Sequence, residues 1–141
     1  MFHDVLCNWC MGIIMRMVVI SFIILLLMIG IWAWFYYTSI GPVTTFYWDK
    51  LTELTDVVRN EDWERAERDL AEYTDKWYET KKVWVFFVNQ RDLDNIDSSI
   101  RQLGVYIENK EKVLAQAELE HLIVLFYIID ENECLTIENI F

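Results

Sequence analysis

The stretch from Met17 to Tyr37 constrains this chain more than any other part of the sequence, because it is long, apolar and free of charged residues. A helix needs about 20 apolar residues to cross the hydrocarbon core of a bilayer, and this stretch provides them. A buried helix of a soluble protein is the alternative, but such helices are usually shorter and keep a polar edge. The sequence therefore predicts a transmembrane helix over 17–37. Its last turns carry aromatic residues of the type that lies at the level of the lipid headgroups: Trp32, Trp34, Phe35, Tyr36 and Tyr37.

The charges beside the predicted span indicate its orientation. Arg16 directly precedes the span, whereas Asp49, Lys50 and Glu53 follow it without a basic cluster. Because basic residues are enriched on the cytoplasmic side of a span, we expect a single-pass protein of the cell membrane with a cytoplasmic N-terminus and an extracytoplasmic C-terminal domain. A cleaved signal peptide is the competing interpretation, which the length of the apolar run and the bulky aromatic residues at its end disfavour.

The part of the chain after the predicted span is strongly acidic. It holds 11 Lys or Arg (12 − 1) and 22 Asp or Glu (23 − 1), because only Arg16 and Asp4 precede the span, and it carries the whole net charge of −11. Nucleic acids and anionic lipid surfaces both bind through clustered Lys and Arg. The balance therefore argues against nucleic acid as a partner and against a domain that lies flat on anionic lipid. We expect contact with membrane lipid through the anchor, and a protein partner for the domain.

The short N-terminal segment, residues 1–16, contains Cys7 and Cys10 in a Cys-x-x-Cys spacing. Such a pair can bind a metal or exchange disulfides, but a zinc site normally needs four ligands, and a thioredoxin-like site needs a strand and a helix around the motif. We interpret the pair as two reduced cytoplasmic thiols. Whether these cysteines belong to the protein depends on the true start, which stays open between four methionines: Met1, Met11, Met15 and Met17.

Gly41 and Pro42 follow the span, and we expect them to break the helix, because proline lacks an N–H and disfavours helical geometry in the residue before it. The sequence therefore predicts a linker over 38–44. Thr44 or Thr45 then provides a side-chain oxygen that can cap a new helix.

Four helices are predicted in the domain over 45–141, from apolar residues at helical spacing. A turn at Asn60 separates the first two helices, and a turn at Asn109 separates the last two. The predicted core stripes are Tyr47, Leu51, Leu54 and Val58; Trp63, Ala66, Leu70, Tyr73 and Trp77; Leu93, Ile96, Ile100, Leu103 and Ile107; and Ala115, Leu119, Leu122, Phe126 and Ile129.

The second pair of helices repeats the first, with Ile100 in the place of Leu51 and Asn109 in the place of Asn60, an offset of 49 residues (100 − 51). Each helical hairpin has an apolar face that it cannot bury alone, so packing the two together yields a four-helix bundle or a short solenoid-like stack. We predict an all-α fold, with one N-terminal transmembrane helix followed by a four-helix domain built from two repeated helical hairpins.

Two segments, 83–88 and 122–129, are more apolar than a bundle requires, and both are too short to span a membrane. We expect most of these residues in the core. The rest would form a partner surface or contact the membrane, since a contiguous exposed apolar patch is seldom left uncovered. The residues predicted for a possible partner surface are Val83, Trp84, Phe86, Phe87, Phe126 and Tyr127.

Several motifs resemble a known family: Asp62-Trp63-x-x-Ala66, the stretch 89–97, and the ending Glu-Asn-Ile-Phe over 138–141, beside the aliphatic anchor. With these motifs, nearly the whole chain resembles a family of small single-span proteins of endospore-forming Firmicutes, catalogued as domain of unknown function 4363. The resemblance implies a bacterial membrane protein with no assigned activity.

The pattern with most ligand character in the domain is Glu118-x-x-His121, the unit that di-iron carboxylate bundles use. One copy is not enough for such a site, because the other histidine, His3, precedes the span. Gly-rich phosphate loops and nucleophile motifs are absent from the sequence. We therefore predict no catalytic, cofactor-binding or metal-binding residues and no enzyme activity.

Together these features predict a membrane-anchored helical interaction or scaffold module that binds a membrane or extracytoplasmic protein. An accessory subunit of a polytopic membrane complex is the alternative, and a metal-dependent enzyme is a second, weaker alternative. The oligomeric state stays open. For Cys134, the one cysteine after the span, we predict shielding by a returning C-terminal tail and a monomer on non-reducing gels.

Overall fold

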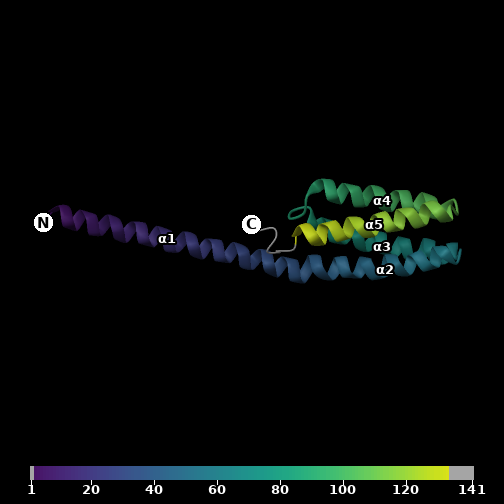
Figure 1. Ribbon diagram of the computed structural model, residues 1–141, viewed down its shortest axis with the longest axis horizontal. Helices are drawn as coiled ribbons and strands as arrows, with labels where there is room; N and C mark the ends of the chain where they lie inside the picture. Colours follow the sequence, from purple (N-terminus) through teal and green to yellow (C-terminus); the bar gives the residue numbers. More distant parts are fainter. Residues whose placement is uncertain (1, 134–141) are drawn as a thin grey trace. The chain divides into compact units, whose positions relative to one another are not determined.

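The computed structural model describes residues 2–133, with side chains from Met15 onward, and nearly all of these residues are helical (Figure 1). The chain divides into two compact units, one that ends at Thr38 and one that begins at Ser39. The predicted all-α fold is confirmed. In chain order the helices are α1 (Phe2–Phe35), a π-helix (Tyr36–Ile40), α2 (Gly41–Arg59), α3 (Trp63–Trp84), α4 (Gln90–Glu108) and α5 (Lys112–Glu133).

The first unit consists mainly of α1, whose apolar side chains from Met15 to Ile31 are largely exposed. Within residues 2–133 one helical run, which begins at Met15, is long and apolar enough to cross a membrane, and its apolar window of 18 residues has a mean hydropathy of 2.7. The core helix of a soluble protein would be mostly buried, whereas only 6% of the apolar window of this run is buried. By length, composition and exposure, α1 therefore suits a membrane span.

The second unit is a four-helix bundle in which α2 packs against α3 and α5, and α4 packs against the same two helices (Figure 1). Because consecutive helices are joined by short turns, neighbours run antiparallel and the bundle has an up-and-down order. The amphipathic stripes explain the packing. Leu54, Ala66, Leu103 and Leu119, one from each helix, are all fully buried.

The two hairpins of the bundle repeat each other closely. α2 and α4 each have 19 residues, and α3 and α5 each have 22. The start of α4 follows the start of α2 by 49 residues (90 − 41), and α5 follows α3 by the same number (112 − 63). The predicted hairpin repeat is therefore confirmed. The two hairpins pack as a four-helix bundle and not as a solenoid-like stack.

Both hairpin turns close their first helix in the same way. Glu61 and Lys110 adopt left-handed backbone conformations, with φ of 61° and 58°. In the first turn the Asp62 N–H donates to the Val57 carbonyl at 3.2 Å, which is the hydrogen bond of a Schellman motif. Asp62 then caps α3 through its carboxylate, which accepts from the Arg65 N–H at 3.2 Å.

The predicted helix break at Gly41 and Pro42 is wrong. Gly41 begins α2 directly after the π-helix, and the proline lies in the first turn of α2, so the helical backbone continues through both residues. Thr44 is not a cap, because its hydroxyl donates to the Ile40 carbonyl at 3.1 Å inside helical structure. The segment predicted as a linker, 38–44, therefore lies in the π-helix and the first turn of α2.

An aromatic cluster fills the core of the bundle. The Tyr47 and Phe126 rings stack with centroids 4.2 Å apart, and Trp77 presents its edge to both rings. Trp84 packs edge-on against Trp77 at 5.9 Å. The Tyr47 hydroxyl is satisfied because it donates to the Tyr73 carbonyl at 2.8 Å. We call Tyr47, Trp77, Trp84 and Phe126 the aromatic core.

The prediction for Cys134 and the returning tail lies outside the described residues, as does the C-terminal motif over 138–141. The side chains of Cys7 and Cys10 lie outside them as well.

Candidate interaction surfaces

The structure separates the six residues predicted for a partner surface. Trp84 and Phe126 belong to the aromatic core, with exposed fractions of 0% and 1%, so the surface prediction is wrong for both. Val83, Phe86, Phe87 and Tyr127 are exposed. The physical reason is helical geometry. Residues three or four positions apart lie on the same side of a helix, so any helical run has one side in the core and one in solvent. Where every position is apolar, hydropathy alone does not show which residues lie on which side.

The first exposed apolar surface is the α3–α4 connection, which we define as residues 85–89. Phe86 is 80% exposed and Phe87 52% exposed, and Val83 and Val85 beside them are exposed as well. Val88 is buried, like Trp84 on the other side of the two phenylalanines. The connection is therefore held at both ends by core residues while it presents two phenylalanine rings outward.

The second exposed apolar surface lies where α2 meets α5, and we call it the α2–α5 face. Trp48 of α2 and Tyr127 of α5 line a cavity of about 140 Å³, together with Thr45 and Asp130. The Thr44 hydroxyl, also in this lining, lies 3.1 Å from the Asp130 carboxylate and 3.1 Å from the Ile40 carbonyl, so the two acceptors compete for its one hydrogen. Trp48 was missed by sequence reasoning because it lies outside the core stripe of α2, and an isolated exposed tryptophan has no periodic signal.

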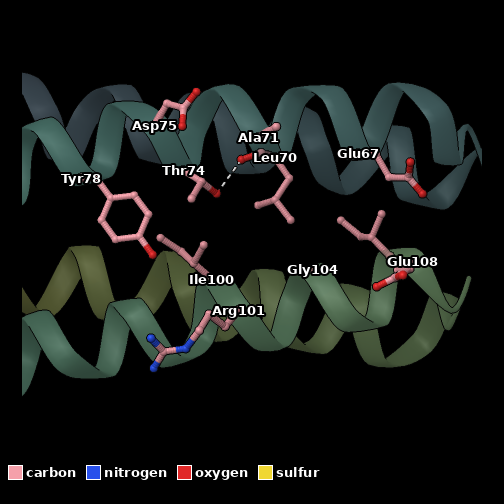
Figure 2. Close-up of a pocket in the computed structure, with 11 residues that line it drawn as sticks. Glu67, Leu70, Ala71, Thr74, Asp75, Tyr78, Ile100, Arg101, Gly104 and Glu108 are labelled. Atoms are coloured by element: carbon pink, nitrogen blue, oxygen red, sulfur yellow. Dashed lines mark hydrogen bonds between the residues drawn. The ribbon is translucent and has the colours of Figure 1, made fainter.

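A wider groove of about 610 Å³ runs between α3 and α4 (Figure 2). Its floor is apolar, with Leu70 and Ile100 pointing into the space between the helices. The charged residues of its lining are mostly acidic, with three carboxylates and the guanidinium of Arg101. Sequence reasoning missed this groove, since nothing in a helical pattern shows how far apart two helices pack. The remaining lining residues are Glu67, Ala71, Thr74, Asp75, Tyr78, Arg101, Gly104, Ile107 and Glu108.

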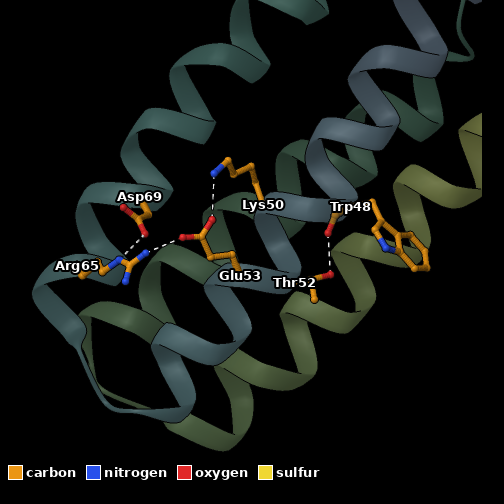
Figure 3. Close-up of polar contacts among 6 residues, drawn as sticks. All are labelled: Trp48, Lys50, Thr52, Glu53, Arg65 and Asp69. Carbon is orange, nitrogen blue, oxygen red and sulfur yellow. Dashed lines mark hydrogen bonds and ion pairs between the residues drawn. The ribbon is translucent and has the colours of Figure 1, made fainter.

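Charged side chains link α2 to α3 on the surface (Figure 3). Arg65 lies 2.6 Å from the Glu53 carboxylate and 3.4 Å from that of Asp69, and Lys50 lies 3.0 Å from Glu53. The hydrogen bond from Lys50 holds the pKa of the Glu53 carboxyl below its usual range, and that from Glu53 raises the pKa of Lys50. Because all four groups contact solvent, such pairs contribute little to stability and have no catalytic character.

Asp97 of α4 connects α4 to the aromatic core. Its carboxylate accepts a hydrogen bond from the Trp77 indole at 2.5 Å and another from Lys81. The Lys81 bond, together with the nearby charge of Asp97, raises the pKa of Lys81. Both oxygens of the half-buried Asp97 carboxylate therefore accept a hydrogen bond. One of these bonds satisfies the indole N–H, the one polar group in the side chain of the fully buried Trp77.

The Glu118-x-x-His121 unit lies on α5 near α4. His121 Nδ1 is 3.3 Å from Glu118 Oε1, and the same oxygen accepts a hydrogen bond from Ser99 of α4 at 2.5 Å. Among the described residues, no three His, Cys, Asp or Glu side chains gather closely enough to hold a metal ion. The unit therefore joins two helices through hydrogen bonds in this structure.

Two raised pKa values make the stability of the bundle depend on pH at the alkaline end. Burial raises the pKa of the Tyr47 phenol, and the Asp97 hydrogen bond raises that of Lys81. A group whose pKa rises on folding stabilises the bundle fully at pH values below its pKa in the unfolded chain, which is about 10 for both groups. This contribution is lost as the pH rises through the pKa of the folded state.

We expect urea midpoints that fall from pH 10 upward. Tyr47→Phe should cost about 1 kcal/mol at pH 8 and show a shallower fall above pH 10, because the phenol no longer titrates. Equal slopes for both proteins would contradict the assignment.

The geometry above defines a class of protein: a four-helix bundle attached to an apolar helix, with exposed apolar surfaces and surface ion pairs. Residues 34–140 match the family described as "Domain of unknown function (DUF4363)". The chain belongs to this family, as its sequence motifs predicted. No curated protein and no solved structure matches the chain.

Proposed function

We propose that the protein is a single-pass membrane-anchored scaffold whose bundle binds a protein partner through the α2–α5 face. The observation that carries the proposal is the cavity between Trp48 and Tyr127, two aromatic side chains that are each 52% exposed. Exposed aromatic residues around a small pocket are the usual anchors of protein interfaces. The proposal gives the bundle a binding role and no catalytic step.

The chemistry of the cavity favours a basic side chain of the partner. Trp48 and Tyr127 bring two aromatic rings to the lining, a residue type that attracts cations, and the Asp130 carboxylate lies in the same lining. The charge of the whole chain, −11, favours approach of a basic surface as well. We infer that a lysine or arginine of the partner enters this cavity.

The position of the α2–α5 face favours a partner in or near the membrane. Trp48 follows Ser39 by nine residues, and a helix of that length rises by about 14 Å. Ser39 in turn follows Tyr37, the last residue of the predicted span, by two positions. Trp48 therefore lies within about 14 Å of Ser39 along the helix, which supports an accessory subunit of a polytopic membrane complex as the second candidate.

Site-specific photo-crosslinking in intact cells tests the proposal. A benzoylphenylalanine at Tyr127 should crosslink to one other protein, whereas the same probe at Tyr78, an exposed tyrosine on α3, should not. Trp48→Ala removes one wall of the cavity without touching the core, so it should abolish the crosslink, and added salt should weaken it.

Three results would contradict the proposal. The first is a product that persists in Trp48→Ala, and the second is equal crosslinking from Tyr78. The third is a product that contains only this chain, since it would make the α2–α5 face a contact between copies.

A further inference from the structure

We propose that the α3–α4 connection is a second membrane contact, in which Phe86 and Phe87 enter the interfacial layer of the bilayer. The inference rests on the anchor of the proposed function, and it concerns a different surface from the α2–α5 face. Phe86 has the most exposed ring among the phenylalanines whose side chains the structure describes, and Val83, Val85 and Phe87 near it in the chain are exposed as well. A patch of this kind is seldom left in water.

The connection is held in place and does not hang loosely from the bundle. Trp84 and Val88 are buried on either side of the two phenylalanines, and the Val88 N–H donates to the Trp84 carbonyl at 2.8 Å. The Asn89 side chain then caps α4 by accepting from the Arg91 N–H at 2.9 Å. The backbone that carries the two rings is thus held in place, which lowers the entropic cost of inserting them.

The connection lies at the end of the bundle from which the chain leaves for the anchor. The Trp84 indole donates to the Ser39 hydroxyl at 2.9 Å, so the connection and Ser39 share one end of the bundle, which we call the tether end (Figure 1). The two hairpin turns lie at the opposite end, where Lys112 pairs with Glu61 at 3.0 Å. Two residues of chain reach at most about 8 Å, so covalent connection alone keeps Ser39 close to Tyr37 and thus to the predicted membrane boundary.

The charges beside the connection suit a lipid surface. Lys82 precedes the apolar residues and Arg91 follows them, and both are exposed. Lys82 pairs with exposed Glu79, and an exposed ion pair of this kind contributes little stability, so it can be exchanged for a lipid headgroup. Long basic side chains of this kind reach the headgroups while neighbouring aromatic rings lie deeper. Because the domain as a whole is acidic, the apolar rings and not the charge carry the contact, and phosphatidylcholine, a zwitterionic lipid with no net charge, is a sufficient partner.

A fluorescent probe tests this contact in the full-length protein, reconstituted into phosphatidylcholine vesicles with brominated acyl chains. In a background with all three cysteines changed to serine, the environment-sensitive label NBD is attached to Phe86→Cys. The matched control is Val113→Cys, a 77% exposed apolar position beside Lys112 at the end opposite the tether end. A third label at Leu26→Cys reports on the anchor itself.

We expect a blue-shifted emission and quenching by brominated lipid at positions 26 and 86, and neither at position 113. Phe87→Glu should shift the label at 86 back to the emission of an aqueous probe, since a carboxylate opposes insertion. Quenching at 26 without quenching at 86 would overturn this inference and leave the anchor intact. An unquenched label at 26 would overturn both the anchor and this inference.

Discussion

Replacing Trp77 with alanine is expected to lower the free energy of unfolding of the bundle by about 3–5 kcal/mol, as large-to-small aromatic substitutions in cores do. Trp77 is fully buried and packs edge-on against Tyr47, Phe126 and Trp84. The substitution leaves a cavity among three rings and removes the indole donor from Asp97. Urea unfolding of the full-length protein in detergent, followed by near-ultraviolet circular dichroism, measures the loss.

Trp63 provides the matched control for this substitution. The helical stripe of α3 predicts both tryptophans as core, but Trp63 is only partly buried at the first position of the helix. Trp63→Ala should therefore cost less, about 1–2 kcal/mol. Equal losses for the two variants would contradict the packing described for the aromatic core.

The helical architecture could be predicted from the sequence because the stripes are regular and the hairpin repeats. Turn residues at Asn60 and Asn109 mark equivalent positions, and the structure closes both turns with a left-handed residue directly afterwards. The start of α2 could not be predicted, because Pro42 is compatible both with a helix break and with a first turn. Packing of Thr44 and Tyr47 against the bundle favours the helical choice.

The candidate surfaces were harder to predict than the fold. In 83–88 and 122–129 every position is apolar, so the period that separates core from surface is lost. The sequence therefore groups Trp84 with Phe86, although Trp84 is buried and Phe86 is the most exposed apolar residue of the connection. The cavity beside Trp48 depends on two helices whose sequences are distant, and it becomes visible only once α2 and α5 are packed.

We expect every copy of the chain to have the same orientation in the membrane. We propose that α1 crosses the membrane with its N-terminus in the cytoplasm and the bundle outside. Arg16 is a basic residue at the N-terminal end of the apolar stretch, and basic residues near a span are retained in the cytoplasm. At the other end the exposed rings of Trp34 and Tyr37 suit the headgroup layer. Both the proposed binding face and the proposed lipid contact of the connection depend on this anchor.

Protease accessibility in intact cells or protoplasts tests this central claim most directly. With an epitope tag at each end of the full-length chain, external protease should remove the C-terminal tag and the bundle from Gly41 onward. The N-terminal tag should survive on a membrane-bound fragment and disappear only after lysis. Survival of the C-terminal tag until lysis, or recovery of the intact chain in the soluble fraction, would contradict the account.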